Sequence, residues 1–253
     1  MILDAFILRG KVAIVTGCDT GLGQGMSLGL AEAGCDIIGI NRKYPHDTEQ
    51  QVIALGRRFT AIQADLSQQA SYDALVQEAV NRMGRIDILV NNAGTIRRAD
   101  ALEFSEQDWD DVINLNLKAT FFLCQAVARQ FIAQGGGGKI INIASMLSFQ
   151  GGIRVPSYTA SKSGVLGLTR LLANEWAPHG INVNAVAPGY MATNNTQQLR
   201  EDAQRNDEII NRIPAARWGT PDDLKGPAVF LASSASDYVN GYTLAVDGGW
   251  LAR

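Results

Sequence analysis

The sequence predicts a single α/β domain built on a parallel, doubly wound sheet. Short apolar runs alternate with helical patterns along the whole chain, and neither a repeat nor a flexible linker divides it. Helices between consecutive strands imply crossover connections, which make neighbouring strands parallel. Ligands of such sheets bind beyond the carboxyl ends of the strands. The runs expected to form the seven strands are residues 12–15, 36–40, 59–63, 86–90, 139–144, 181–186 and 242–246.

The intervening segments have apolar residues at helical spacing, and one long segment does not. Residues 191–213 are polar and charged between two core elements. They form either a solvated surface excursion or a lid over a site, and we expect the lid because long connections in compact domains are usually functional. The domain thus spans residues 1–253. The expected helices are 23–34, 47–58, 67–83, 105–133 and 155–176.

The composition restricts the possible partners and location. A net charge of -3 argues against nucleic acid or an anionic membrane as a partner. No stretch reaches 18 apolar residues and no signal-like leader opens the chain, so we expect a cytoplasmic protein. Cys18, Cys35 and Cys124 lack a CxxC pair, and the two histidines lack ligand-like neighbours. We therefore expect reduced thiols and chemistry without a metal.

A glycine-rich turn, "TGCDTGLG" at residues 16–23, directly follows the first strand and opens a helix. Glycines there permit a tight turn and a close approach of the backbone to a pyrophosphate at the helix N-terminus. A purely structural turn is the alternative. In this context the motif predicts a Rossmann-type dinucleotide site. Its expected contacts are Gly17, Thr20, Gly21, Leu22 and Gly23.

Two further strand ends have polar or small residues. "NNAG", residues 91–94, could hold the sheet end rigid, flank an adenosine, or do both. Asp65 could accept a hydrogen bond from an adenine amino group, or it could be an acid at a helix N-terminus. The residues expected at the cofactor from these segments are Asp65, Leu66, Asn92, Ala93 and Gly94.

The stretch "YTASK" places Tyr158 and Lys162 four residues apart on one helix face. Ser145 ends a strand thirteen residues earlier, so its hydroxyl can reach the same pocket. Asn116 lies in the middle of a predicted helix, where amides are disfavoured. Each of these features alone has an ordinary alternative. Tyr158 and Lys162 could be an exposed pair on a helix, and Ser145 could be a turn or cap residue. Asn116 could be a surface or packing amide.

Together, "TGCDTGLG", "NNAG", Asn116, Ser145, "YTASK" and "APGYMAT" resemble the short-chain dehydrogenase/reductase family in order and spacing, over essentially the whole chain. The resemblance implies NAD(P)-dependent hydride transfer in which Tyr158 exchanges a proton with the substrate oxygen. It also implies that Ser145 hydrogen-bonds that oxygen and that Asn116 anchors a proton-relay water. Lys162 would lower the pKa of Tyr158, which is ordinarily near 10, and hold the nicotinamide ribose. The "APGYMAT" residues expected at the nicotinamide carboxamide are Pro188, Gly189, Met191 and Thr193.

The end of the second strand gives mixed signals about the cofactor. Asn41 stands where members that prefer NAD generally have Asp, although its amide can still bond a ribose hydroxyl. Arg42 would accommodate a 2′-phosphate, whereas Thr20 stands where NADP-preferring relatives often have a basic residue. We expect NAD, with NADP as the open alternative.

Three segments narrow the resemblance to sugar-acid dehydrogenases of pectin and uronate breakdown: "GCDTGLGQGM", "LSFQGGIRVPSYTASKSG" and "GYMATNNTQQLR". It implies oxidation of 2-dehydro-3-deoxy-D-gluconate at C5 and the reverse reduction. The carboxylate of this small anionic substrate calls for a cation. We expect Arg154 first and Arg97 with Arg98 second, and Gln150 at a sugar hydroxyl.

Alternatives to this function remain open. Gluconate 5-dehydrogenase and 2-deoxygluconate 3-dehydrogenase activities would use the same motifs. A cofactor-binding protein without turnover is disfavoured because Tyr158 and Lys162 are both present. The resemblance further implies a homotetramer, in which Trp250 could reach a neighbouring subunit.

Overall fold

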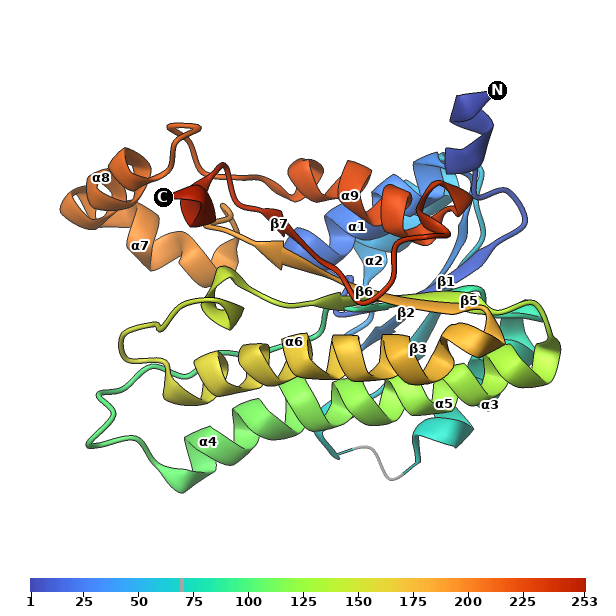
Figure 1. Ribbon diagram of the computed structural model, residues 1–253, viewed down its shortest axis with the longest axis horizontal. Helices are drawn as coiled ribbons and strands as arrows, with labels where there is room; N and C mark the ends of the chain where they lie inside the picture. The colour runs from blue at the N-terminus through green and yellow to red at the C-terminus, as the bar shows by residue number, and fades with distance from the viewer. Residues whose placement is uncertain (69–70) are drawn as a thin grey trace.

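Seven parallel strands form the central sheet of the computed structural model, which describes residues 1–68 and 71–253 (Figure 1). Their order across the sheet is β3-β2-β1-β4-β5-β6-β7, which confirms the predicted Rossmann-type α/β fold. The chain runs outward from β1 to β3 and then returns to β4, so the switch point lies between β1 and β4. The strands are β1 Val12–Thr16, β2 Asp36–Asn41, β3 Phe59–Gln63, β4 Ile88–Asn91, β5 Gly138–Ile143, β6 Ile181–Pro188 and β7 Thr243–Val246.

Helices cover both faces of the sheet (Figure 1). Helices α3, α5 and α6 pack on one face, and α1, α2 and α9 pack on the other. This arrangement explains why β1, β2 and β4 are buried throughout, because each of their side chains meets a covered face. The helices are α1 Gly21–Glu32, α2 His46–Ala54, α3 Tyr72–Met83, α4 Glu106–Ile113, α5 Thr120–Gln134, α6 Pro156–Trp176, α7 Gln197–Glu201, α8 Ala203–Arg212 and α9 Lys225–Ala232.

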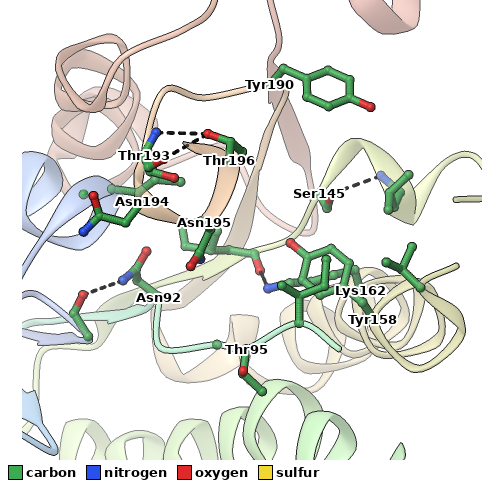
Figure 2. A pocket seen from close by; sticks show the side chains of 18 of the residues that line it. Asn92, Thr95, Ser145, Tyr158, Lys162, Tyr190, Thr193, Asn194, Asn195 and Thr196 are labelled. Atoms are coloured by element: carbon green, nitrogen blue, oxygen red, sulfur yellow. Dashed lines mark hydrogen bonds between the residues drawn. The ribbon is translucent and has the colours of Figure 1, made fainter. Parts of the chain in front are cut away.

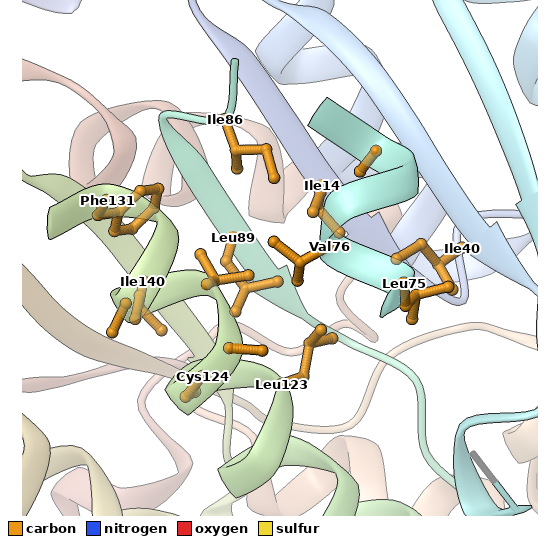
Figure 3. Close-up of a cluster of buried hydrophobic side chains, with 14 of the residues drawn as sticks. Ile14, Ile40, Leu75, Val76, Ile86, Leu89, Leu123, Cys124, Phe131 and Ile140 are labelled. Carbon is orange, nitrogen blue, oxygen red and sulfur yellow. The ribbon is translucent and has the colours of Figure 1, made fainter. Parts of the chain in front are cut away.

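The larger hydrophobic core lies between the sheet and the α3–α5 layer (Figure 3). Ile14 of β1 and Leu89 of β4 are adjacent in the sheet register, and both side chains are fully buried there. Phe131 of α5, also fully buried, packs into the same cluster. This core fixes the inner strands, whose carboxyl ends carry the predicted site.

Two predicted helices differ from the structure. The helix expected at 67–83 begins at Tyr72, with the Ser71 hydroxyl accepting from Ala74 N as an N-cap. A short 3₁₀ turn covers Leu66–Gln68, and residues 69–70 of the prediction lie outside the described part of the chain. The helix expected at 105–133 is interrupted by a π-helical turn at Asn114–Ala119.

Three helices were not expected. Helices α7 and α8 lie inside the polar segment 191–213, and α9 precedes β7. Helix α8 is mostly polar, and Ile209 is its one buried residue. It therefore has too few apolar residues to be recognised as a helix from apolar periodicity. Within the described residues, no helix is both long and apolar enough to cross a membrane.

Candidate active site

A cleft of about 1680 Å³ runs over the carboxyl ends of the central strands. Most of the predicted site residues line it. Five do not reach its surface: Gly23, Arg97, Asn116, Pro188 and Met191. Those that do are Gly17, Thr20, Gly21, Leu22, Asn41, Arg42, Asp65, Leu66, Asn92, Ala93, Gly94, Ser145, Gln150, Arg154, Tyr158, Lys162, Gly189 and Thr193.

The glycine turn fits a pyrophosphate. Gly17 and Gly21 have φ values of 64° and 57°, in a region of backbone conformation that residues other than glycine rarely adopt. A Cβ on Gly23 would lie 2.1 Å from Gly17 O, so any larger residue would push the turn apart. Helix α1 begins at Gly21 with neither a side-chain cap nor an acidic residue in its first turn. Its N-terminal N–H groups and positive dipole end therefore suit an anion.

Asn92 holds this turn in place. Its Nδ2 donates to Thr16 O at 3.0 Å and to Gly17 O at 2.8 Å. Gly23, although outside the cleft, packs behind the same contact, because a Cβ there would meet Asn92 Nδ2 at 2.4 Å. The sequence left a structural and a cofactor role open for "NNAG". The structure gives Asn92 the structural role and also places it on the cleft wall.

The segment after β6, whose residues were expected at the nicotinamide carboxamide, also borders the cleft. Thr193 lies against the glycine turn, since a Cβ on Gly21 would be 3.5 Å from its Cγ2. Met191 is buried, and its carbonyl accepts from Thr196 Oγ1 at 2.6 Å. Gly189 leaves no room for a side chain, because a Cβ would lie 2.6 Å from Asp247 Cα.

Asn41 differs from its prediction. Its Oδ1 accepts from Cys18 N at 2.7 Å and its Nδ2 donates to Cys18 Sγ at 3.3 Å. The amide is buried and fastens the second strand to the glycine turn, which takes up the groups expected for a ribose hydroxyl. Arg42 and Lys43 are exposed beside it, and Asp19 lines the same end of the cleft.

Asp65 shows the second of its two predicted roles. Its Oδ1 accepts from Ser67 N at 3.0 Å and from Ser67 Oγ at 2.6 Å, so it caps the 3₁₀ turn that follows β3. Asp65 also lines the cleft, which leaves its other carboxylate oxygen as a candidate partner for an adenine amino group.

Ser145, Tyr158 and Lys162 meet at the centre of the cleft (Figure 2). Ser145 follows β5 and caps a short 3₁₀ turn through Leu147 N, while α6 carries the other two residues. Lys162 Nζ lies 5.6 Å from the Tyr158 ring centroid and donates to Ile143 O at 2.6 Å. The helix therefore directs both side chains toward the end of β5.

The pKa values of this pair reflect burial more than mutual attraction. Burial raises the pKa of the Tyr158 phenol, and the Ser145 hydroxyl and the Arg98 charge only partly counter it. Burial lowers the pKa of Lys162 to about 8. The expected lowering of the Tyr158 pKa by Lys162 is thus absent in the protein alone, because desolvation outweighs the favourable groups.

Asn116 sits in the π-helical turn, just behind the cleft. Its Oδ1 accepts from Thr95 N at 2.8 Å, and its Nδ2 donates to Thr95 O at 2.9 Å and to Ser161 Oγ at 3.3 Å. Ser161 lies on α6 between Tyr158 and Lys162. The amide therefore ties α6 to the loop after β4, and a relay water could use only the backbone carbonyl of Asn116, which also accepts from Thr120 Oγ1.

The predicted substrate cations are placed differently. Arg97 does not line the cleft, because it pairs with Asp108 at 3.2 Å and Asp111 at 2.9 Å on α4. Arg98 does line it, and its charge acts on Tyr158. Arg154 also lines the cleft but pairs with Asp100 at 3.1 Å, while Gln150 lies on the same wall.

Several lining residues were missed by sequence reasoning. Helix α8 and the segments around it contribute side chains that no motif marks, and the lid prediction gave no particular residues. Trp250, which was expected to reach a neighbouring subunit, is 5% exposed within its own chain and lines that chain's cleft. The missed residues include Asp19, Thr95, Tyr190, Asn194, Asn195, Arg205, Glu208, Arg212 and Trp250.

Oxidation of an alcohol needs a hydride acceptor beside a group that can take up the hydroxyl proton, and this cleft provides for both. The fold and site define an oxidoreductase that acts on a CH–OH group with a nicotinamide cofactor. Residues 11–204 match the family model of the short chain dehydrogenases. The chain belongs to that family.

Relatives resemble the chain over its full length. It is 75% identical over 253 residues to the 2-dehydro-3-deoxy-D-gluconate 5-dehydrogenase of Escherichia coli (strain K12), covering 100% of both proteins. The enzyme of the same name from Dickeya dadantii (strain 3937) is 72% identical, again over 100% of both. A solved structure from Agrobacterium tumefaciens, of a candidate 2-deoxy-D-gluconate 3-dehydrogenase with bound NADP, is 55% identical with a TM-score of 0.93. It covers 99% of this chain and 100% of that one.

Proposed function

We propose that the protein interconverts 2-dehydro-3-deoxy-D-gluconate and 3-deoxy-D-glycero-2,5-hexodiulosonate, in the breakdown of pectin and uronates. The observation that carries this proposal is the 75% identity, over the whole of both chains, to an enzyme named for that substrate. The cleft supports it, because Ser145 and Tyr158 meet there and several arginines line the walls.

The proposed chemistry takes place at the substrate C5 oxygen. When bound, the nicotinamide accepts the hydride from C5 in oxidation and returns it in reduction. The Tyr158 Oη takes the proton of the C5 hydroxyl, and Ser145 Oγ hydrogen-bonds the same oxygen. In the reverse direction Tyr158 gives the proton back.

The other two predicted residues act around this pair. Lys162, held by Ile143 O at 2.6 Å, places a positive charge beside the phenol and would hold the nicotinamide ribose. Asn116 positions α6 through Ser161, and its backbone carbonyl is the available acceptor for a relay water. Residues 191–213 act as the lid, a role supported by the many cleft-lining side chains that they contribute.

For the cofactor we propose NAD. Asp19 lines the cleft one residue after Cys18, whose N–H is bonded to Asn41 at the end of β2. A carboxylate in that position suits ribose hydroxyls and repels a 2′-phosphate. Two observations favour NADP instead: Arg42 and Lys43 are exposed, and the Agrobacterium relative was solved with bound NADP. The ratio of kcat/KM for NAD and NADP decides between them.

The quaternary state and location are proposals of the same kind. A homotetramer is supported by exposed apolar side chains on α5 and α6, namely Phe122, Ile132 and Leu171. Mass photometry that found an active monomer would overturn it. A cytoplasmic location is supported by the three buried cysteines, all unpaired thiols.

Steady-state kinetics on 2-dehydro-3-deoxy-D-gluconate, run in parallel with NAD and NADP, tests the function. Turnover with formation of the 2,5-diketo product supports the proposal. Turnover only with gluconate or 2-deoxygluconate would instead support the activity named for the Agrobacterium relative or a related one. No turnover of any of these sugar acids would contradict the substrate class.

A further inference from the structure

Helix α8 brings one cation to the cleft without an acidic partner. Three of its ionisable side chains line the cleft: Arg205, Glu208 and Arg212. Arg205 Nη1 pairs with Glu208 Oε2 at 2.9 Å, so these two charges largely offset each other. In residues 1–68 and 71–253, Arg212 has no carboxylate within ion-pair distance. Its charge is therefore available to a ligand.

Arg212 is also held in place. Its guanidinium carbon lies 3.9 Å from the ring centroid of Trp250, and that indole is 5% exposed. Tyr190 packs on the indole, with ring centroids 4.9 Å apart at 65°. Arg253 Nη2 donates to Asn211 O at 2.9 Å and to Arg212 O at 2.7 Å, which fastens the end of α8. A guanidinium over a ring uses its face, so its N–H groups remain free at the edge.

This stack lies close to the reacting groups. Trp250 packs in one cluster with Met146, the residue directly after Ser145, and with Ile209 and Ile213. Trp250 and Arg212 therefore extend the cleft wall that begins at Ser145. In 2-dehydro-3-deoxy-D-gluconate, four carbon–carbon bonds separate C5 from the C1 carboxylate, about 5 Å when extended. Ser145 and Arg212 line the same cleft, so a carboxylate that extends from C5 toward α8 approaches this wall.

The other candidate cations are less suitable. Arg97 is bound by Asp108 and Asp111 outside the cleft, and Arg154 is paired with Asp100. Arg98 acts on Tyr158 itself, which places its charge at the reacting end of the substrate.

We propose that Arg212, stacked on Trp250, binds the C1 carboxylate of the sugar acid and selects acids over neutral sugars. Two edge N–H groups of the guanidinium donate to the two carboxylate oxygens. Because Arg212 belongs to segment 191–213, this bond also draws that segment over the substrate. The inference rests on the proposed function for the identity of the substrate, but not for the class of anion.

The test compares Arg212→Gln, Arg212→Lys and Trp250→Phe with the wild type. Substrates are 2-dehydro-3-deoxy-D-gluconate and its neutral carboxamide, which has the same reacting carbon. Arg212→Gln should raise KM for the acid about 10- to 100-fold, with kcat within threefold, and leave the carboxamide unchanged. Arg212→Lys keeps the charge without the fork and should give an intermediate KM. Arg129→Gln is the control, because Arg129 is an exposed arginine on α5 outside the cleft, and it should change KM less than threefold.

An unchanged KM for Arg212→Gln, or an equal rise for the carboxamide, would overturn the proposal. Calorimetric titration of the cofactor-free protein with D-gluconate separates it from the proposed function. A wild type that binds gluconate through Arg212 but does not oxidise the keto acid would contradict only the function. A wild type that oxidises the acid, together with an Arg212→Gln variant that binds gluconate equally well, would contradict only the carboxylate site. Should Arg212→Gln fail to fold, Arg212→Lys and Trp250→Phe carry the same comparison.

Discussion

Ser148 joins the segment after β5, which carries Ser145, to helix α6, since its hydroxyl donates to Lys162 O at 2.6 Å. The oxygen of that hydroxyl accepts from Ser145 N at 3.3 Å. Ser145 and Lys162 belong to different elements, the end of β5 and the middle of α6. Together with the bond from Lys162 Nζ to Ile143 O, this hydroxyl therefore fixes Ser145 relative to the helix that bears Tyr158.

Replacing Ser148 should impair catalysis more than folding. Ser148→Ala removes both hydrogen bonds, at a stability cost of about 1–2 kcal/mol. We expect kcat to fall about 10-fold or more with KM changed much less, because small misplacements of reacting groups slow chemistry. Ser148→Thr, which retains the hydroxyl, should recover much of the rate. Ser234→Ala, which removes an exposed hydroxyl–carbonyl bond to Ala5, is the control and should keep full kcat. Equal kcat in Ser148→Ala and wild type would contradict this role.

Tyr158→Phe should abolish turnover without loss of the cofactor. Removing a general acid–base typically costs about 10²- to 10⁴-fold in rate. Because burial raises the pKa of Tyr158, wild-type oxidation should accelerate as pH rises above neutrality, and the variant should lose that rise. Cofactor affinity is measured by fluorescence titration and activity by a pH series. A variant with full activity would exclude Tyr158 as the base.

Lys162→Met should make the protein more stable at pH 7 and inactive. The pKa of Lys162 is lowered from 10.5 to about 8, so the buried ammonium opposes folding at low pH. At about 1.4 kcal/mol per pKa unit, the charged Lys162 lowers the free energy of unfolding by about 3 kcal/mol below pH 8. Its hydrogen bond to Ile143 O offsets about 1 kcal/mol of this loss. Between pH 8 and 10.5 the unfolded chain binds the extra proton, so wild-type stability rises with pH and the advantage of the variant disappears.

Urea unfolding at pH 7 and pH 10.5 measures this difference. The exposed Lys43 provides the control, since Lys43→Met should leave the unfolding free energy nearly unchanged at both pH values. A Lys162→Met protein less stable than the wild type at pH 7 would show that the ammonium stabilises its surroundings instead.

Gly23→Ala should damage both the fold and cofactor binding. The new methyl would lie 2.1 Å from Gly17 O and 2.4 Å from Asn92 Nδ2, so the glycine turn must shift. We expect about 1–3 kcal/mol of destabilisation, as for other overpacked sites, and weaker binding of NAD. Gly226→Ala on α9 is the control, because the added Cβ meets nothing within 4 Å. This substitution should raise Tm slightly, since alanine favours a helix more than glycine does. Unfolding curves and NAD titration of both variants make the comparison, and wild-type affinity in Gly23→Ala would contradict the proposal that the glycine turn binds the pyrophosphate.

Arg42→Ala should separate the two cofactors. Arg42 is exposed at the cleft beside Asn41, where a 2′-phosphate would bind. Its loss should raise KM for NADP about 10-fold and change KM for NAD by less than threefold. Equal effects on both would mean that Arg42 contacts a group that the two cofactors share.

Local patterns predicted the frame of this protein well. The inner strands β1, β2 and β4 are buried on both faces, so their apolar runs are visible without tertiary information. The i,i+4 spacing of Tyr158 and Lys162 fixes their shared direction once α6 forms. Ser145 could be expected beside them because it follows the carboxyl end of a strand, where ligands of parallel sheets bind.

Residues whose position depends on distant partners could not be predicted. Arg97 and Arg98 are adjacent in sequence, and only the acids of α4 decide that Arg97 turns away from the cleft. Asn41 faces Cys18, 23 residues earlier, so its amide is taken up by a contact that no local motif shows. The position of Arg212 depends on Trp250, which is distant in sequence, near the C-terminus of the chain.

The number of residues in the π-helical turn Asn114–Ala119 determines where the side chain of Asn116 points. Such a turn holds one residue more than an α-helical turn, and each helical residue rotates the chain by about 100°. Deleting one residue there would let the helix close to regular geometry and swing Asn116 away from Thr95 and Ser161. Neighbouring side chains can repack around a substitution in this stretch, but they cannot compensate for a deleted residue. We therefore expect related sequences with a gap here to have lost the link between α6 and the β4 loop.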